Sequence, residues 1–198
     1  MIFDMVAALE KRVDVLSAAS AALGGMTAVG LLLRRMHREF ESTGQLTVPT
    51  MVGMYACYVG HAAATALAAR EQVGALRLPS GPALGLGGVL VAGGAGLCVA
   101  GMRRFAGPRQ ISGTDVGGLA TGGVYRYTRN PQYVGYVGFL AGVGLARRSA
   151  AVLGLASAVA LVFRWLVPVE ERHLEREFAD DYRRYRKQVP RWLGPRFV

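Results

Sequence analysis

Two short polar segments carry the residues best suited to chemistry in this sequence. Arg129 and Asn130 precede Pro131, and Asn-Pro is typical of a helix start, because asparagine caps free N–H groups and proline fits the first helical position. The positive end of that helix, next to a guanidinium, attracts an anion such as a carboxylate or a phosphate. Glu170 and Glu171 provide negative charge and a candidate general base. Together the two segments predict a site for a ligand that carries a carboxylate together with cationic or hydroxyl groups.

A helical hairpin is expected to bring these segments together. The apolar block over residues 132–169 is too long for one membrane span, and residues 146–149 interrupt it with two arginines, which predicts the tip of a hairpin. Because the two arms run antiparallel, the glutamate pair returns to the face where the arginine and the asparagine lie. The first arm has only about 15 residues and reaches about 22 Å, so we expect a thinned bilayer or a partly re-entrant arm.

The composition predicts that the whole chain is embedded in a membrane. Of the 198 residues, 52% are hydrophobic and only 18% are charged, whereas soluble domains have about 25% charged residues. Three further apolar runs, at residues 13–33, 50–69 and 82–102, are long enough to cross a bilayer. We therefore predict an all-α polytopic membrane protein with about five transmembrane helices, of which the last two form the hairpin.

A single membrane domain over residues 1–198 is expected, with two parts. Residues 1–110 form a three-helix scaffold, and residues 111–198 carry the motifs, with the hairpin at 131–169 and an amphipathic helix at 170–189. One face of that last helix is apolar and consists of Leu174, Phe178, Tyr182, Tyr185 and Val189. Its basic neighbours suit anionic headgroups, so the helix is predicted to lie along the membrane and cover the mouth of the hairpin.

The distribution of charge predicts the orientation and excludes several classes of partner. The net charge is +10, and most of the 23 lysines and arginines fall on the side that also holds the C-terminus and the polar site, which places that side in the cytoplasm. These cations border apolar runs, so we expect no nucleic-acid partner. Cys57 and Cys98 both lie inside apolar runs, so neither a metal site nor a disulfide framework is expected. The composition is compatible with a bacterial plasma membrane, and the small-residue helix faces permit a homodimer.

The two motifs resemble those of a known superfamily. Residues 123–135 read Gly-x-Tyr-x-x-x-Arg-Asn-Pro-x-Tyr-x-Gly, and residues 170–190 read Glu-Glu-x-x-Leu-x-x-x-Phe-x-x-x-Tyr-x-x-Tyr-x-x-x-Val-Pro. In this order they resemble the isoprenylcysteine carboxyl methyltransferase and phospholipid methyltransferase superfamily, over residues 119–192. The resemblance implies an integral membrane enzyme that uses S-adenosylmethionine, which the two motifs bind in a pocket closed by the C-terminal helix.

The resemblance also implies roles for individual residues. The cofactor pocket would be lined by Tyr125, Arg129, Asn130, Pro131, Tyr133, Gly135, Glu170 and Glu171. Arg129 and the two glutamates are the expected catalytic residues. The family most often has histidine in place of Asn130, so the role expected here is hydrogen bonding or capping instead of imidazole chemistry.

Two polar residues, Arg164 and His61, lie inside the apolar segments. Arg164 lies two helical turns before Glu171 on roughly the same face, and we include it as a catalytic candidate that pairs with an acidic substrate headgroup or with Glu171. The alternative is an arginine that snorkels to the interface. His61, in the middle of an apolar run, is expected to be a hydrogen-bonded packing residue.

The expected activity is methyl transfer to a lipophilic or lipidated acceptor that enters from the bilayer. Carboxyl O-methylation of an isoprenylcysteine-like acceptor needs little acid–base chemistry and would depend on proximity and desolvation. Phospholipid amine N-methylation is the nearest alternative, in which Glu170 or Glu171 would take a proton. Two further alternatives are a membrane sterol or enone reductase, whose C-terminal region has a similar hairpin, and a non-catalytic lipid-binding membrane protein.

Overall fold

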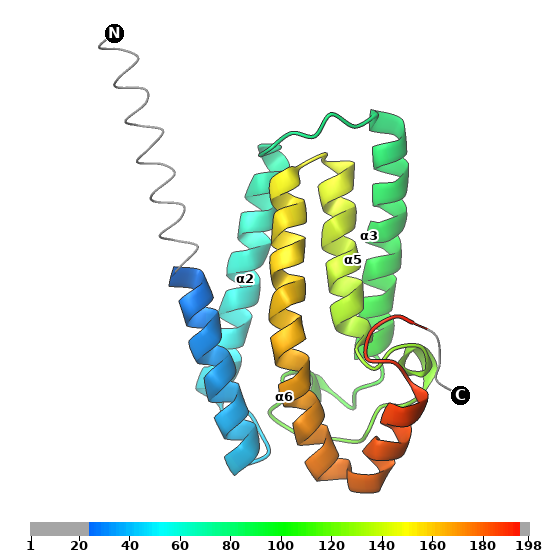
Figure 1. Ribbon diagram of the computed structural model, residues 1–198. Helices are drawn as coiled ribbons and strands as arrows, with labels where there is room; N and C mark the ends of the chain where they lie inside the picture. The colour runs from blue at the N-terminus through cyan, green and yellow to red at the C-terminus, as the bar shows by residue number, and fades with distance from the viewer. Residues whose placement is uncertain (1–23, 195–198) are drawn as a thin grey trace.

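The computed structural model describes residues 24–194, and helices dominate this part of the chain (Figure 1). The first described helix covers residues 24–42. It is followed by α2 (Val48–Arg70), α3 (Ser80–Met102), α4 (Pro108–Ile111), the 3-10 turn η1 (Gly123–Arg126), α5 (Pro131–Ala146) and α6 (Ala150–Gln188). Between residues 24 and 194 there is no β-strand, which confirms the all-α prediction.

Three helices, α2, α3 and α6, are long and apolar enough to cross a membrane. Two of them coincide with the runs predicted at residues 50–69 and 82–102. The run predicted at residues 13–33 lies partly outside the described residues. The first hairpin arm, α5, has 16 residues and reaches about 24 Å, so it is short for a span, as predicted. The total of five spans therefore stays a prediction.

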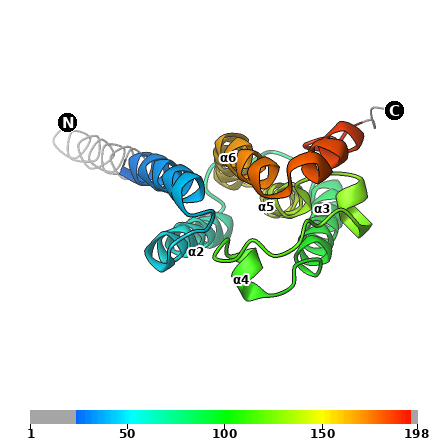
Figure 2. The same cartoon turned by 90° about the horizontal axis from the view of Figure 1, so that it is seen from below.

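The long helices form a bundle in which α5 lies between α3 and α6, and α2 packs on α6 (Figures 1 and 2). The α2–α3 connection and the tip of the α5–α6 hairpin lie at one end of this bundle. The connection over residues 103–130, which includes α4, and the C-terminal part of α6 lie at the other end (Figure 2). All the predicted polar motifs thus come together at this second end.

Glycines bring the backbones of α3 and α5 into direct contact. A Cβ atom on Gly135 would lie 2.5 Å from the carbonyl oxygen of Gly94, and a Cβ atom on Gly142 would lie 2.7 Å from that of Gly87. Helices in a bilayer gain little hydrophobic energy by associating, so close packing of this kind provides much of their attraction. Gly135, which we expected in the cofactor pocket, therefore lies in this seam between two helices.

The hairpin tip is fastened to the end of α2. The Ser149 hydroxyl donates to the carbonyl oxygens of Ala68 and Val73 and accepts a hydrogen bond from the Val152 N–H at the start of α6. Arg147 donates through Nε to the carbonyl of Ala69 at 3.0 Å. These bonds satisfy backbone groups at the ends of two helices and fix the hairpin against α2.

At the opposite end, the first described helix is held to α2 by a carboxylate. Burial would raise the pKa of Glu39, but hydrogen bonds from Arg35, from the Thr47 N–H and from the hydroxyls of Thr50 and Thr47 outweigh it and lower the pKa to about 2. The charged carboxylate therefore fixes the turn between the two helices. This turn sets the last part of the first helix beside the polar end of the bundle.

The predicted boundary between the hairpin and a separate helix at residue 170 is wrong. Helix α6 continues through Pro168 to Gln188, and the backbone leaves the helical region only at Ala179, with φ 42° and ψ −115°. Proline keeps a φ angle that a helix accepts, so it does not have to end one, whereas a left-handed residue redirects the chain. Beyond Ala179 the chain turns across the end of the bundle (Figure 1). Its position along a membrane surface stays a prediction.

The apolar face predicted for this last segment is a packing face. Tyr182, Tyr185 and Val189 are buried around Tyr125 of η1, and Leu174 packs against the same cluster. The Tyr185 hydroxyl donates to the carbonyl oxygen of Tyr125 at 2.8 Å. The two motifs, far apart in the sequence, are therefore joined by one apolar cluster.

Candidate functional site

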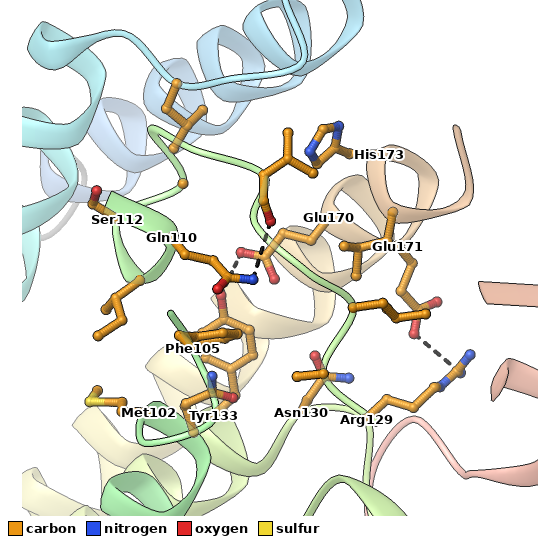
Figure 3. Close-up of a pocket in the computed structure, with 18 of the residues that line it drawn as sticks. Met102, Phe105, Gln110, Ser112, Arg129, Asn130, Tyr133, Glu170, Glu171 and His173 are labelled. Carbon is orange, nitrogen blue, oxygen red and sulfur yellow. Dashed lines mark hydrogen bonds and ion pairs between the residues drawn. The ribbon is translucent and has the colours of Figure 1, made fainter. Parts of the chain in front are cut away.

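A cavity of about 400 Å³ lies where the 103–130 connection meets the C-terminal part of α6. This is within the size range of small-molecule sites. The predicted residues that line it are Tyr125, Arg129, Asn130, Tyr133, Glu170 and Glu171. Figure 3 shows five of them around one space, with Gln110 and Ser112 of the connecting segment on the other side.

Three predicted site residues lie elsewhere. Pro131 is fully buried at the first position of α5, and Gly135 packs against α3. Arg164 is exposed and lines a separate groove on the outside of the bundle, so it does not pair with Glu171. The structure therefore separates residues that shape the helices from residues that face the cavity.

One carboxylate is held between two guanidinium groups at the cavity wall. Arg129 Nη2 lies 3.1 Å from Glu171 Oε1, and both side chains are more than nine-tenths buried. Arg191 donates through Nη2 to Glu171 Oε2 at 2.6 Å and through Nε to both oxygens at 3.1 Å. Its hydrogen bonds to Glu171 raise the pKa of Arg191. Two cations thus share one anion, which leaves this cluster with an excess of positive charge.

Several buried polar atoms at the cavity have no hydrogen-bond partner within the described part of the chain. They are Nε and Nη1 of Arg129, the Tyr182 hydroxyl and Nδ1 of His173. A buried donor that is left unsatisfied costs about 1–3 kcal/mol, so proteins rarely keep one unless a ligand or water uses it. An anionic ligand group beside Arg129 would satisfy two of these donors at once.

The Asn130 side chain does not cap α5, and that prediction was wrong. Asn130 occupies the N-cap position, but its Nδ2 donates to the carbonyl of Arg191 at 2.9 Å. Thr128 donates to the same carbonyl, and the Arg129 N–H donates to the carbonyl of Pro190 at 3.0 Å. The chain after α6 runs beside residues 128–130, and its carbonyl groups therefore compete for these donors. These hydrogen bonds hold the tail, the segment of residues 189–194, against the cavity wall. They place the Arg191 guanidinium next to the Glu171 carboxylate.

The two neighbouring glutamates have different surroundings. The Tyr133 hydroxyl donates to Glu170 Oε1 at 2.5 Å, and the Tyr133 ring packs on Phe163 with centroids 4.3 Å apart. Among the described residues no cation contacts Glu170. Glu171 is therefore a neutralised structural carboxylate, whereas Glu170 is a partly buried carboxylate whose only partner among the described residues is a phenol.

The opposite wall of the cavity is apolar and reaches the outer surface. Tyr55 and Tyr58 of α2 and Met102 of α3 line it, and Tyr55 and Met102 are each more than two-fifths exposed. Both helices are long and apolar enough to span a membrane. The cavity therefore extends from the charged cluster to residues on the surface of two candidate spans.

His61 is a packing residue, as predicted. Its Nδ1 lies 3.3 Å from the Tyr136 hydroxyl, and its Nε2 lies 3.2 Å from the carbonyl oxygen of Leu155. It therefore joins α2 to both arms of the hairpin.

A comparison with protein families identifies the family of this chain. A family model described as phospholipid methyltransferase matches residues 83–181, half of the chain. This chain belongs to the phospholipid methyltransferase family. The family is part of the wider superfamily of integral membrane methyltransferases that the motifs resemble, and its members generally use S-adenosylmethionine. The comparisons with curated proteins and with solved structures gave no match.

The matched region includes α5, Arg129 and the glutamate pair, but it ends before Tyr182, which lines the cavity, and before Arg191, which pairs with Glu171. Arg191 and Tyr182 lie beyond residue 181, and sequence reasoning gave neither of them a place in the site. In the sequence, Arg191 is one of the C-terminal cations that predict the orientation, and no site role follows from that. The useful signal was its position directly after Val189 and Pro190, where the second motif ends.

Proposed function

We propose that this chain is an integral membrane methyltransferase that uses S-adenosylmethionine to methylate a lipophilic acceptor. The observation that carries the proposal is the cavity itself. Within residues 24–194, it combines a buried arginine that has unpartnered donors, a carboxylate that has no cationic partner, and an apolar wall on two candidate membrane spans. S-adenosylmethionine supplies an electrophilic methyl group on a sulfonium cation and also carries an amino-acid carboxylate.

The residues present fit that cofactor at its carboxylate end. Arg129 offers Nε and Nη1, which are buried and free to donate two hydrogen bonds. Guanidinium–carboxylate pairs of this kind are bidentate and strong. Arg191 neutralises Glu171 from the other side, so Arg129 keeps donors for a ligand. The buried Tyr182 hydroxyl is a further group that could bind in the cavity.

The environment of Glu170 supports an amine as the acceptor group. A carboxylate acceptor placed beside Glu170 would meet a like charge at low effective dielectric, whereas a protonated amine would meet an opposite one. Glu170 can also accept the proton that an ammonium must lose before its nitrogen can react. An amino phospholipid is therefore the acceptor that we favour over the isoprenylcysteine-like carboxylate.

The apolar wall supports entry of the acceptor from the bilayer. Tyr55 and Met102 belong both to the cavity and to the outer surface of α2 and α3. A lipid tail could remain in the bilayer between these helices while its headgroup reaches Glu170. The charged cluster at the other side faces the end of the bundle that is predicted to be cytoplasmic, from which a water-soluble cofactor enters.

A transfer assay tests the proposal. The purified protein is incubated with S-adenosylmethionine labelled on its methyl group and either phosphatidylethanolamine or S-farnesylcysteine. We expect base-stable label on the phosphatidylethanolamine, and a loss of at least about 100-fold in Glu170→Gln. The control variant is Glu175→Gln, which removes a carboxylate that pairs with Arg186 outside the cavity.

Each other outcome has a definite meaning. Base-labile label on S-farnesylcysteine would indicate carboxyl O-methylation and reject the amine assignment. Binding of a nicotinamide cofactor instead of S-adenosylmethionine would indicate the reductase alternative. Folded protein that binds neither cofactor would contradict the proposed function as a whole.

A further inference from the structure

A second hollow lies on the outer side of the hairpin, behind the wall of the cavity. This groove has a volume of about 410 Å³ and runs between α5, α6 and the chain that follows α6. Its apolar residues are Val134, Val137, Ala160, Trp192 and Leu193. Tyr133 and Phe163 line both the groove and the cavity, so their packed rings separate the two spaces.

Among the residues that the structure describes, Arg164 is the one charged residue that lines the groove. This arginine lies in the apolar part of α6 and is exposed. Within residues 24–194 it has no hydrogen bond or ion pair, and no carboxylate lines the groove. An arginine in a membrane-spanning segment is costly unless it finds an anion or reaches the interface. An anion from outside residues 24–194 would therefore stabilise Arg164 in this position.

The position of the groove matches the depth of lipid headgroups. Its end is marked by Val134, in the first turn of α5, and by Trp192, in the segment that follows α6, so it opens at the polar end of the bundle. Trp165, beside Arg164, is 72% exposed. Tryptophan is enriched at the boundary between hydrocarbon and headgroups. An anion at Arg164 would therefore lie at the level of lipid phosphates.

We propose that this groove binds an anionic glycerophospholipid, whose phosphate pairs with Arg164 and whose acyl chain lies along Val137 and Ala160. A second copy of the chain is a poorer occupant, because α2 and α3 contain no Asp or Glu that could reach Arg164. The cytoplasmic leaflet of membranes is rich in anionic lipids. The site is separate from the acceptor site, since Tyr133 and Phe163 stand between them, and it does not depend on the proposed function.

The chain contains only two tryptophans, so lipid binding in the groove can be followed by tryptophan fluorescence. In Trp165→Phe the fluorescence comes from Trp192 in the groove. This variant is reconstituted in phosphatidylcholine vesicles that contain either brominated phosphatidylglycerol or brominated phosphatidylcholine, both of which quench tryptophan on contact. We expect Trp192 to show an apparent affinity about fivefold higher for the phosphatidylglycerol, as one arginine near the surface provides.

Two changes in the Trp165→Phe background test the assignment. Arg164→Gln is expected to abolish the preference, whereas Arg126→Gln removes an exposed cation elsewhere at the same end and should leave the preference unchanged. Ala160→Phe fills the groove and should reduce quenching by both lipids. Circular dichroism shows whether each variant keeps its helical content.

The proposal is overturned by either of two results. One is equal quenching by the two brominated lipids before any change at Arg164, which would mean contact with bulk lipid only. The other is a preference that persists in Arg164→Gln. Methyl transfer is not part of the readout, so a failure here leaves the proposed function standing, and the reverse also holds.

Discussion

The α3–α5 seam and the charged cluster around Glu171 each take one residue from the 123–135 motif, and the two residues act by opposite means. At the seam, Gly135 has no side chain, and its backbone touches the backbone of Gly94. At the cluster, Arg129 and Glu171 meet through long side chains, and Arg191 joins them from the tail. A family motif therefore contains two kinds of residue, those that let helices approach and those that bind.

The packing of α5 on α3 at the seam also orients Tyr133 toward Glu170. Gly135 and Tyr133 are two positions apart on α5, so they face different sides of the helix. One side lies against α3, and the other presents the Tyr133 hydroxyl to Glu170. A change at the seam should therefore act on stability first, whereas a change at the cluster should act on binding alone.

The largest effect is expected at the seam. In Gly135→Ala the new Cβ atom would lie 2.5 Å from the carbonyl oxygen of Gly94 and 2.8 Å from the Cys98 nitrogen, and neither backbone atom can move cheaply. We expect a loss of about 3 kcal/mol in stability, measured by unfolding in detergent. Gly138→Ala is the matched control, because its Cβ atom would meet only the Gly94 Cα at 3.9 Å. Equal stability of the two variants would show that the close backbone contact at Gly135 is not needed for stability, and the contrast between the seam and the cluster would fail.

At the cluster, Arg129→Gln is expected to lower S-adenosylmethionine affinity by about 100-fold, because a charge-assisted pair with the ligand carboxylate is lost. Calorimetric titration measures the affinity, and thermal unfolding without ligand should change little. A variant that binds normally would show that Arg129 serves only to hold Glu171.

A smaller effect on affinity is expected from Arg191→Gln. Glu171 would lose its bidentate partner and would draw the free donors of Arg129 to itself. We expect S-adenosylmethionine affinity to fall about tenfold. Arg191→Lys keeps the charge and should recover part of the loss. If neither substitution alters affinity, Arg191 plays no part in binding the cofactor.

Asn130→Ala tests how the tail is fastened. It removes the hydrogen bond to the Arg191 carbonyl, while Thr128 still donates to the same atom. A stability loss of about 1 kcal/mol is expected in thermal unfolding. A much larger loss would mean that Asn130 does more than hold residue 191.

Arg164→Gln should have the smallest effect on the site, with S-adenosylmethionine affinity unchanged within about twofold, because Arg164 lines the outer groove and not the cavity. The same calorimetric titration checks this. A tenfold loss of S-adenosylmethionine affinity would show that Arg164 contributes to the cofactor site after all.

Most of the helices could be predicted from the sequence, because hydropathy and the arginine pair at the hairpin tip mark their limits. The break at Ala179 could not, since nothing in a run of helix-forming residues signals a left-handed backbone at an alanine. Hairpin geometry correctly brought Arg129 near the glutamate pair. It could not distinguish Glu170 from Glu171, because that difference depends on Arg191, which reaches Glu171 only through the turn of α6 and the tail.

Pro131 and Gly135 show the limit of transferring a motif as a list of site residues. Both belong to the motif, yet one starts a helix and the other packs it. The Asn130 side chain illustrates the same limit, because a local capping rule cannot foresee a carbonyl that arrives from residue 191.

The most direct test of the central claim compares S-adenosylmethionine with its decarboxylated analogue, by calorimetry, in the unsubstituted protein and in Arg129→Gln. If the free donors of Arg129 bind the cofactor carboxylate, the unsubstituted protein should prefer S-adenosylmethionine by about 100-fold, and the variant should bind both ligands equally. Equal binding of the two ligands by the unsubstituted protein, or a preference that survives in the variant, would contradict the account.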